Sequence, residues 1–329
     1  MFSLVSKICQ SLDNREHVSG LFLDLSKAFD VVNHDLLLQK IERFGIRGNS
    51  LSWLSSYLTR RTQVVEIPYV DKFGCLNRFH SDEEPVKSGV PQGSVLGPIL
   101  FILFINDLLT SVPGADLYLF ADDTSLVVSD KDRSRLQIET FVRSGAILQW
   151  LEDNFLAVNS QKTKFLNFSL KKPLDYADLE AVLIDEMELY PSANVTYLGV
   201  ILDNKLAFSE HIDRVCSKVS SGIFLLRRLS FFGTVDLLLT AYYGCVYPFL
   251  SYCFCIWGNA ASSKIVRLFR LQKKAVRVIF GLKSSETCKS IFKNNKLLTF
   301  PSIFILEAVT FVKNNFQLFL IFQFKSAFL

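Results

Sequence analysis

Short apolar runs bounded by polar residues recur along the first two thirds of the chain, and such runs are typical of β-strands. The run over residues 17–26 predicts a buried strand. Between the runs, apolar residues recur with helical spacing. Further strands are predicted over residues 62–70, 116–120, 124–129, 155–169 (two strands around a polar turn) and 194–203 (a strand or a hairpin). Helices are predicted over residues 27–45, 49–61, 99–109 and 134–154. Residues 71–87 indicate a loop or irregular hairpin, and the chain beyond about residue 208 indicates mainly helix.

Two adjacent acids, Asp122 and Asp123, stand between two apolar runs in "LFADDTSL", residues 119–126. A two-residue polar connection between such runs predicts a tight β-hairpin with both acids at its tip. Aspartate tolerates turn geometry and hairpin tips normally face water, so a plain solvated turn is the alternative.

Residues 88–98, "SGVPQGSVLGP", form a loop rich in glycine and proline that leads into an apolar helix. Glycine lets a backbone approach a ligand closely, and proline favours the start of a helix. The alternative is an ordinary loop and helix start, because glycine and proline by themselves mark many loops.

A segment without any charged residue covers residues 237–263 and is long enough to span a bilayer. It contains Pro248, Gly244, tyrosines, serines and a threonine. These residues favour a buried or broken core helix over a membrane span. We therefore expect no stable membrane association. The apolar tail over residues 314–329 is too short to span a membrane, and its pattern favours no particular structure.

Composition indicates a folded chain, because half of the 329 residues are hydrophobic and 30 are phenylalanine. Residues 1–199 carry a net charge of −7 and residues 200–329 one of +11, which together make the +4 of the whole chain. An acidic part followed by a basic part suits a metal-using site joined to a polyanion-binding surface. Surface charge kept for solubility is the alternative.

The seven cysteines are scattered, none forms a C-x-x-C pair, and the chain has only four histidines. This pattern argues against a zinc site or a disulfide framework and for reduced thiols. We expect an intracellular protein, and the sequence does not decide between nucleus and cytoplasm.

The acids could form one cluster, because Asp24 ends the first predicted strand while Asp122 and Asp123 follow another. Two carboxylates about 4 Å apart repel by roughly 4 kcal/mol at an effective dielectric constant near 20. Protons or cations must then lie among them, and oxygen ligands favour Mg²⁺ or Mn²⁺. Two such ions are an arrangement used in nucleotidyl transfer. Sequence spacing alone does not show that Asp24 meets Asp122.

Three blocks, "LFLDLSKAFDVVNHDLLLQKI", "SGVPQGSVLGPILFILFINDL" and "LYLFADDTSLVV", resemble motifs A, B and C of the reverse transcriptases of non-LTR (LINE-like, Jockey-type) retrotransposons. "QWLEDNFLAVNSQKTKFLNFS" resembles motif D with its preceding helix, and "VTYLGVILDNKLAFSEHI" the segment after it. The resemblance runs from about residue 17 to about residue 313. It implies an α+β fold with a polymerase palm (an antiparallel sheet backed by helices) and a remnant of the fingers over residues 1–207. A mainly helical thumb and C-terminal region would cover residues 208–329.

The resemblance also implies the roles of single residues. Asp24 and Asp122 would be the catalytic ligands of two Mg²⁺ ions, with Mn²⁺ as an alternative, and Asp123 their companion acid. The partners would be an RNA template, a DNA primer and deoxynucleoside triphosphates. The nucleotide-binding residues would be Phe29, Pro91, Gln92, Gly93 and Lys162, and the primer-binding residues Phe120, Ala121, Tyr197, Leu198 and Gly199.

Three of these assignments have plain structural alternatives. Phe29 would crowd a 2′-hydroxyl and so select deoxynucleotides, or it is a core residue on the helix predicted over residues 27–45. Lys162 would donate a proton to pyrophosphate or contact a phosphate, or it is a solvated surface lysine. Residues 197–199 would grip the primer, or they are a buried strand and turn.

The segment over residues 262–282 predicts an amphipathic helix with a basic face formed by Lys264, Arg267, Arg270, Lys274 and Arg277. The apolar face consists of Ile265, Leu268, Ala275, Val276 and Ile279. A basic face of this kind suits the phosphate backbone of nucleic acid. Binding to a membrane surface or simple solvation are the alternatives.

Only 23 residues precede Asp24, whereas the family has most of its fingers there. We therefore expect an N-terminally truncated reverse transcriptase, a retroelement remnant or partial gene product, whose activity the sequence leaves open. The second hypothesis is a catalytically inactive fragment that binds nucleic acid. A membrane-associated protein led by residues 237–263 is the third, and Phe29 disfavours an RNA-templated RNA polymerase.

Overall fold

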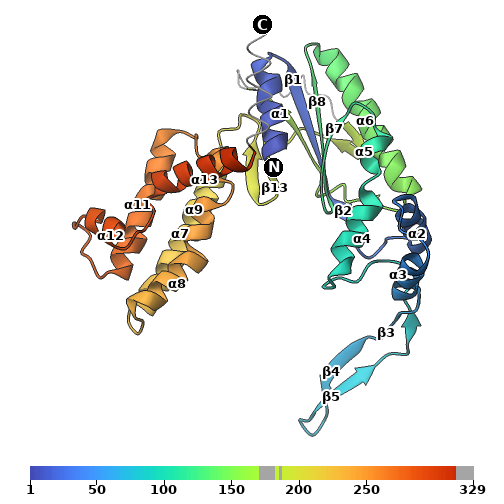
Figure 1. The fold of residues 1–329 in the computed structure, drawn as a ribbon, viewed down its shortest axis with the longest axis horizontal. Helices are drawn as coiled ribbons and strands as arrows, with labels where there is room; N and C mark the ends of the chain where they lie inside the picture. The colour runs from blue at the N-terminus through green and yellow to red at the C-terminus, as the bar shows by residue number, and fades with distance from the viewer. Residues whose placement is uncertain (170–181, 185–186, 316–329) are drawn as a thin grey trace. The chain divides into compact units, whose positions relative to one another are not determined.

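The computed structural model describes residues 1–169, 182–184 and 187–315, which form two compact units. The sheet unit consists of Lys7–Ser192, and the helical unit of Met1–Ser6 together with Ala193–Leu329 (Figure 1). The functional division after residue 207 stays a prediction.

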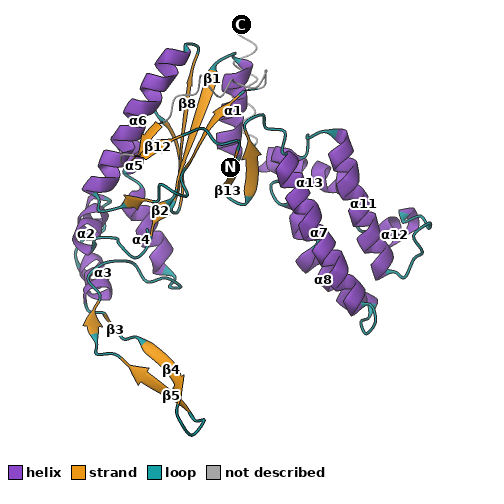
Figure 2. Cartoon of the chain, turned by 180° about the vertical axis from the view of Figure 1, so that it is seen from behind, coloured by secondary structure: helices purple, strands orange, loops and turns teal. Residues whose placement is uncertain are grey.

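The sheet unit is built on a four-stranded antiparallel sheet with the strand order β10-β1-β8-β7 (Figures 1 and 2). Its strands are β1 (His17–Leu23), β7 (Asp116–Phe120), β8 (Asp123–Asp130) and β10 (Lys164–Phe168). Leu23 pairs with Thr124 and Leu21 with Leu126. Mixed α and β structure with an antiparallel sheet is thus confirmed, and the apolar runs that predicted these strands lie in them.

Helices cover one face of this sheet. Successive side chains of a strand point to opposite faces, so the apolar residues on one face can pack against the helices. Leu21 and Leu126 belong to a core that also contains Leu37, Phe101 and Ile147 from three helices. Burying each such side chain contributes about 1.5–3 kcal/mol. The helices of this unit are α2 (His34–Arg43), α3 (Asn49–Thr59), α4 (Leu96–Ile105), α5 (Leu108–Ser111) and α6 (Arg133–Asp153).

An N-terminal helix, α1 (Phe2–Asp13), was not expected from the sequence. Its Ser11 hydroxyl donates a hydrogen bond to the Ser129 hydroxyl of β8, at 3.0 Å. Ser129 alternates with the core residue Val128, so this part of α1 contacts the sheet face opposite α6.

The helix predicted over residues 27–45 begins later than expected, at His34. Lys27 has a φ of 49°, in the left-handed region, and the Asp30 amide donates back to the Lys27 carbonyl, so the chain turns here. Asn33 then caps the helix by accepting a hydrogen bond from the Leu36 amide. The helical prediction for residues 27–33 was therefore wrong. The spacing of apolar residues does not show that a turn precedes the helix and that the helix starts only after the N-cap Asn33.

A buried lysine closes the end of α4. Lys40 donates to the Phe104 carbonyl and to Asp107, both at 2.8 Å, and its ammonium lies over the rings of Phe104 and Trp150. Burial lowers the pKa of Lys40, and the bond to Asp107 opposes that effect. A cation suits this place because the carbonyls at a helix C-terminus lack partners and carry partial negative charge.

Two predicted strand patterns are organised differently in the structure. The strand predicted over residues 62–70 is divided into β3 (Thr62–Gln63) and β4 (Glu66–Val70), which pair with β6 (Glu84–Pro85) and β5 (Leu76–His80). The two strands predicted within residues 155–169 do not pair with each other. Instead β9 (Ala157–Val158) pairs with β2 (Leu25–Ser26), and β10 pairs with β1. A separate short hairpin joins β11 (Val182–Ile184) to β12 (Met187–Leu189).

The main part of the helical unit, from Ala193 onward, starts with a hairpin of β13 (Asn194–Tyr197) and β14 (Val200–Asp203) and continues as helices. The charge-free run is broken into α8 (Val235–Cys245), α9 (Tyr247–Ser251) and α10 (Phe254–Trp257), as expected for a broken core helix. Within the described residues, no helix is both long and apolar enough to cross a membrane. The other helices are α7 (Ser209–Leu229), α11 (Ser262–Ile279), α12 (Lys289–Asn294) and α13 (Phe300–Asn314).

A buried glutamine ties three helices of this unit together. Gln272 of α11 donates to the Tyr242 hydroxyl of α8 at 3.0 Å and to the Leu298 carbonyl at 2.9 Å. Its own carbonyl accepts from the Phe300 amide at the start of α13, at 2.7 Å. The side-chain nitrogen and oxygen of Gln272 are both hydrogen-bonded, so the free-energy cost of burying this polar side chain is small.

Candidate active site

Strand register brings Asp24 beside Asp123. The strand β1 ends at Leu23, whose partner in β8 is Thr124. One position further along an antiparallel pair, Asp24 lies opposite Asp123, the first residue of β8. Two of the three acids thus come from adjacent strand ends, a relation that the separate runs in the sequence did not reveal.

The third acid lies in the turn between β7 and β8. Phe120 pairs with Asp123, so the connection consists of Ala121 and Asp122, one residue earlier than the predicted tip. Ala121 has a φ of 52°, a left-handed conformation that costs an L-residue about 1–2 kcal/mol. Such strain is common at functional sites, where the surroundings hold the backbone in place.

The three carboxylates influence one another electrostatically. The pKa of Asp123 is raised, mainly because the side chain is half-buried and further because of the charges of Asp122 and Asp24. Negative charge is therefore concentrated at this end of the sheet, where a cation would be stabilised.

A loop after β9 folds against Asp24. The Asn159 amide donates to the Asp24 carbonyl at 2.7 Å, and the Asp24 amide donates to the Thr163 hydroxyl at 3.3 Å. Lys162, on the same loop, places its Nζ 3.5 Å from Oδ2 of Asp24. The side chain of Lys162 is 70% exposed, so it is both a surface lysine and a neighbour of the acids.

The donor set at this place fits a divalent cation in chemistry. Three carboxylates are oxygen donors of the kind that Mg²⁺ prefers, and the charges of Asp122 and Asp24 add to burial in raising the pKa of Asp123. Within residues 1–169, 182–184 and 187–315, however, no three Asp, Glu, His or Cys side chains are arranged as a ready group of metal ligands.

Phe29 lies in the turn before α2, not on a helix as its core alternative assumed. Its ring stacks on the buried ring of Phe101, with the centroids 4.6 Å apart, and remains partly exposed. The Phe29 carbonyl accepts a hydrogen bond from the Val90 amide at 2.7 Å. Phe29 is therefore a core contact on one side and a surface residue on the other.

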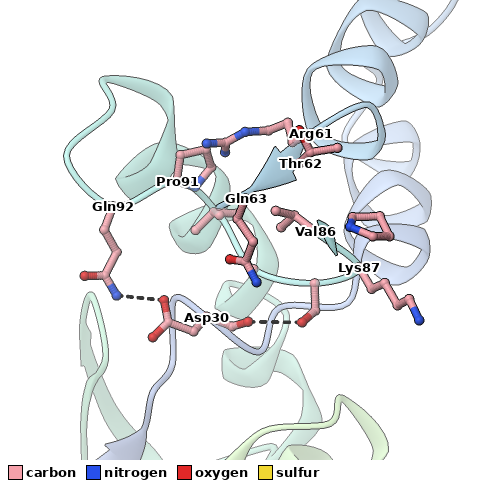
Figure 3. A pocket seen from close by; sticks show the side chains of 12 residues that line it. Asp30, Arg61, Thr62, Gln63, Val86, Lys87, Pro91 and Gln92 are labelled. Atoms are coloured by element: carbon pink, nitrogen blue, oxygen red, sulfur yellow. Dashed lines mark hydrogen bonds between the residues drawn. The ribbon is translucent and has the colours of Figure 1, made fainter. Parts of the chain in front are cut away.

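The glycine- and proline-rich loop borders a pocket of about 560 Å³ (Figure 3). Pro91 and Gln92 line it, and the Gln92 side-chain amide donates to Asp30 at 2.8 Å. Gly89 has a φ of 89°, and a Cβ there would lie 2.7 Å from the Asp30 carbonyl oxygen, so this close approach requires glycine. Gly93, the next residue after Gln92, also has a positive φ, 81°.

Several residues of this pocket were missed from the sequence, among them Asp30, Arg61, Gln63 and Lys87. Asp30 follows Phe29 in the turn, whereas Arg61, Gln63 and Lys87 come from the base of the hairpin arm formed by β3 to β6. No local pattern joins these segments, so only the fold could identify them.

The remaining candidate primer residues belong to the helical unit. Tyr197 pairs with Val200, so Leu198 and Gly199 form the turn between β13 and β14, with φ values of 45° and 80°. Tyr197 is buried, and the Tyr252 hydroxyl donates to the Leu198 carbonyl at 2.7 Å. The strand residue Tyr197 is thus buried while the turn residue Gly199 is exposed, and the primer-binding role stays a prediction.

The basic face of α11 is only partly available to a ligand. Lys264 donates to the Ser209 hydroxyl, Arg267 pairs with Asp213, and Arg277 donates to the Glu286 carbonyl. Arg270 and Lys274 are exposed, and neither has a hydrogen bond or ion pair within the described residues. On the opposite face Leu268, Ala275, Val276 and Ile279 are buried, while Ile265 is half-buried.

The fold thus gathers most candidate residues of the sheet unit into two groups. Asp24, Asp122, Asp123 and Lys162 form one, and the short strand β2 and the turn after it connect Asp24 to Asp30, which lines the pocket with Gln92. Phe120 and Ala121 lie at the hairpin of the first group.

Comparison with known proteins connects this arrangement to a family. The family model described as "Reverse transcriptase (RNA-dependent DNA polymerase)" matches residues 3–202. Proteins of similar sequence from Drosophila melanogaster include the probable RNA-directed DNA polymerases from transposon BS (31% identical over 292 residues) and from transposon X-element (31% over 311). The RNA-directed DNA polymerase from mobile element jockey is 30% identical over 295 residues. These matches cover 84%, 90% and 84% of this chain, which spans only 30%, 32% and 30% of the respective relatives.

The solved structures that match this chain include telomerases. The apo telomerase from Candida tropicalis has a TM-score of 0.47 and 13% sequence identity, covering 93% of this chain and 50% of the telomerase. The telomerase from Candida albicans in complex with a fragment of telomeric RNA has a TM-score of 0.36 and 16% identity, covering 88% of this chain and 52% of that one.

Proposed function

The chain belongs to the reverse transcriptases (RNA-dependent DNA polymerases) of non-LTR retrotransposons, and from this premise we propose that it acts in RNA-directed DNA synthesis. Residues 1–207 would be the palm with a remnant of the fingers, and residues 208–329 the thumb and C-terminal region. The observation that carries the proposal is the strand register that puts Asp24 opposite Asp123, with Asp122 in the adjoining turn.

The acids are proposed to hold two divalent cations, Mg²⁺ or Mn²⁺. When bound, these ions would supply activation of the primer 3′-hydroxyl and stabilisation of the leaving pyrophosphate. Asp24 and Asp122 would provide the oxygen ligands, and Asp123, whose pKa is raised by burial and by the charges of Asp122 and Asp24, would be their companion acid. The backbone bonds from Asn159 and to Thr163 hold the Asp24 main chain, so positioning comes from the protein.

Other side chains are proposed to bind the substrates. The Nζ of Lys162 can give a proton to departing pyrophosphate or contact a phosphate, because its side chain is exposed beside Asp24. The exposed side of Phe29 would crowd the 2′-hydroxyl of a ribonucleotide. Phe120 and Ala121, together with Tyr197–Gly199, would contact the DNA primer. Pro91, Gln92 and Gly93 would contact the incoming nucleotide.

Arg270 and Lys274 are the members of the α11 face that we propose for the backbone of the RNA template and DNA primer. Arg267 would contribute less, because Asp213 already neutralises it. The seven free thiols support an intracellular location, which we propose without choosing a compartment.

The second candidate function is binding of nucleic acid without catalysis. Two observations favour it. The ammonium of Lys162 lies 3.5 Å from the Asp24 carboxylate, where it competes with a metal ion, and no three acids of the described residues form a group of metal ligands. The basic helix α11 would remain able to bind phosphates whether or not the acids bind metal.

Primer extension separates the two functions. The chain and its Asp122→Ala variant are compared on poly(rA) with oligo(dT) and labelled dTTP, with and without Mg²⁺. Exposed Asp82 provides the control variant Asp82→Ala. Extension that needs Mg²⁺, is lost in Asp122→Ala and persists in Asp82→Ala supports the polymerase. A folded chain that binds the duplex without extending the primer supports the binding function.

A further inference from the structure

The pocket beside the glycine- and proline-rich loop contains a hydrogen bond between two residues far apart in the sequence. Nε2 of Gln92 donates to Oδ1 of Asp30 at 2.8 Å (Figure 3). A side-chain amide has two nearly isosteric ends, one that donates and one that accepts. An ionised carboxylate only accepts, so Asp30 determines which end of the Gln92 amide faces it.

The main chain of Asp30 is held in place by the loop that carries Gln92. The Ser88 hydroxyl donates to the Asp30 carbonyl at 3.1 Å, and the Gly89 amide donates to the Val32 carbonyl at 2.8 Å. Buried His34 donates from Nε2 to the Gly89 carbonyl, also at 2.8 Å. These bonds attach both sides of the turn to the loop, so the Asp30 carboxylate is an acceptor at a defined place.

The other end of the amide has a different environment. Figure 3 shows Oε1 of Gln92 on the side away from Asp30. Arg61 and Gln63 line the same pocket, and Arg61 adds a positive charge. A ligand that fits this arrangement carries a hydrogen-bond donor for Oε1 and negative charge for the guanidinium, as a nucleotide does with its hydroxyl or amino groups and its phosphates.

We propose that Asp30 is a positioning residue that holds the Gln92 amide with Oε1 presented to a hydrogen-bond donor of the bound nucleotide. This inference rests on the proposed function, in which Gln92 contacts the nucleotide. With the carboxylate present, the reversed amide would set its carbonyl against a negative charge. Replacing Asp30 by asparagine removes this preference, because an asparagine can pair with either end of the Gln92 amide.

Steady-state kinetics on the primer–template assay tests whether Asp30 acts through Gln92. We expect Asp30→Asn to raise the KM for dTTP about three- to tenfold with kcat within about twofold, since one solvent-accessible hydrogen bond is involved. In a Gln92→Ala background the same substitution should change KM by less than about twofold. Asp30→Glu, which keeps the carboxylate, should restore part of the loss. Asp82→Asn is the matched control for a lost surface charge.

An equal effect of Asp30→Asn in both backgrounds, or no effect on KM, would overturn the proposal. The orientation itself is measured on the full chain by NMR of ¹⁵N-glutamine-labelled protein. The Gln92 side-chain resonance is identified by its loss in Gln92→Ala, and its hydrogen exchange should be slower in the native chain than in Asp30→Asn. Unchanged exchange would also overturn the proposal. Because this readout needs no catalysis, a chain that never extends a primer refutes the polymerase function and leaves the orientation tested separately.

Discussion

Nζ of Lys162 lies 3.5 Å from Oδ2 of Asp24, so the ion pair of this acid is with a residue of the candidate site itself. The lysine side chain is 70% exposed and that of the aspartate 32%. Ion pairs with this much exposure contribute about 0–1 kcal/mol, so the contact is easily exchanged for another. An ammonium on a carboxylate also opposes a metal cation that would use the same oxygen.

We therefore predict that Lys162→Met strengthens metal binding while it slows catalysis. The dissociation constant for Mn²⁺, measured by electron paramagnetic resonance, should fall about two- to fivefold, because a competing charge worth less than about 1 kcal/mol is removed. Primer extension at saturating metal should be slower if Nζ assists the leaving pyrophosphate. Lys164→Met, an exposed lysine two residues further along, is the control. Equal metal affinities of both variants would refute the competition.

The acids should also destabilise the fold at neutral pH. The pKa of Asp123 is raised in the folded chain by burial and by the charges of Asp122 and Asp24. A carboxyl whose folded pKa exceeds its unfolded value stabilises the protein below the unfolded pKa, and this stability is lost as pH rises through the folded pKa. The ionised Asp123 is therefore unfavourable at pH 7.

Asp123→Asn should accordingly raise the melting temperature at pH 7 by about 1–2 °C, a small shift because Asp123 is only half-buried. The difference from the native chain should shrink as pH falls through the raised pKa of Asp123 toward the ordinary aspartate pKa of 3.8. Thermal melts over this pH range provide the measurement. Asp82→Asn serves as control, and a destabilised Asp123→Asn at pH 7 would contradict the electrostatic account.

The sheet could be predicted from the sequence because its strands are apolar runs that end at polar residues. Such runs predicted β1, β7 and β8, and the helical spacing of apolar residues predicted α6. What failed was the relation between segments. The polar turn after β9 looked like a hairpin connection, but β9 and β10 pair with β2 and β1. Local patterns do not say which strand lies beside which.

The same reason explains what could be predicted of the candidate site. Asp24 and the Asp122–Asp123 pair are marked by their positions at strand ends, yet only the register of β1 and β8 makes Asp24 and Asp123 neighbours. Asp30 carries no signal, because its partner Gln92 lies far along the chain. Buried Lys40 was equally hidden, since a lysine on an amphipathic helix normally faces water.

Phe29 should couple stability to nucleotide choice. Its ring stacks on Phe101 and remains partly exposed. Phe29→Val is expected to lower the free energy of unfolding by about 1–2 kcal/mol, because the half-buried ring that stacks on Phe101 is lost. It should also raise the use of ribonucleotides relative to deoxynucleotides about tenfold or more, since the clash with the 2′-hydroxyl is removed.

The measurement is the ratio of kcat/KM for UTP and dTTP on poly(rA). Phe104→Leu is the control, because Phe104 is fully buried and its ring contacts Lys40, so its truncation should destabilise the chain without changing that ratio. If Phe29→Val alters only the melting temperature, Phe29 is a core residue and does not select deoxynucleotides over ribonucleotides.

Binding of nucleic acid should depend on Arg270 and Lys274, the two exposed cations of α11 that lack a partner in the described structure. Each phosphate contact contributes about 0.9 to the slope of log K against log salt concentration for duplex DNA. The double variant Arg270→Ala/Lys274→Ala should therefore bind a primer–template duplex more weakly and lower the magnitude of the slope by up to about 2. Fluorescence anisotropy over a series of salt concentrations measures both. The variant Lys131→Ala/Arg135→Ala makes the same change in net charge at exposed residues around the start of α6. If both double variants shift the slope equally, the total charge and not the α11 face determines binding.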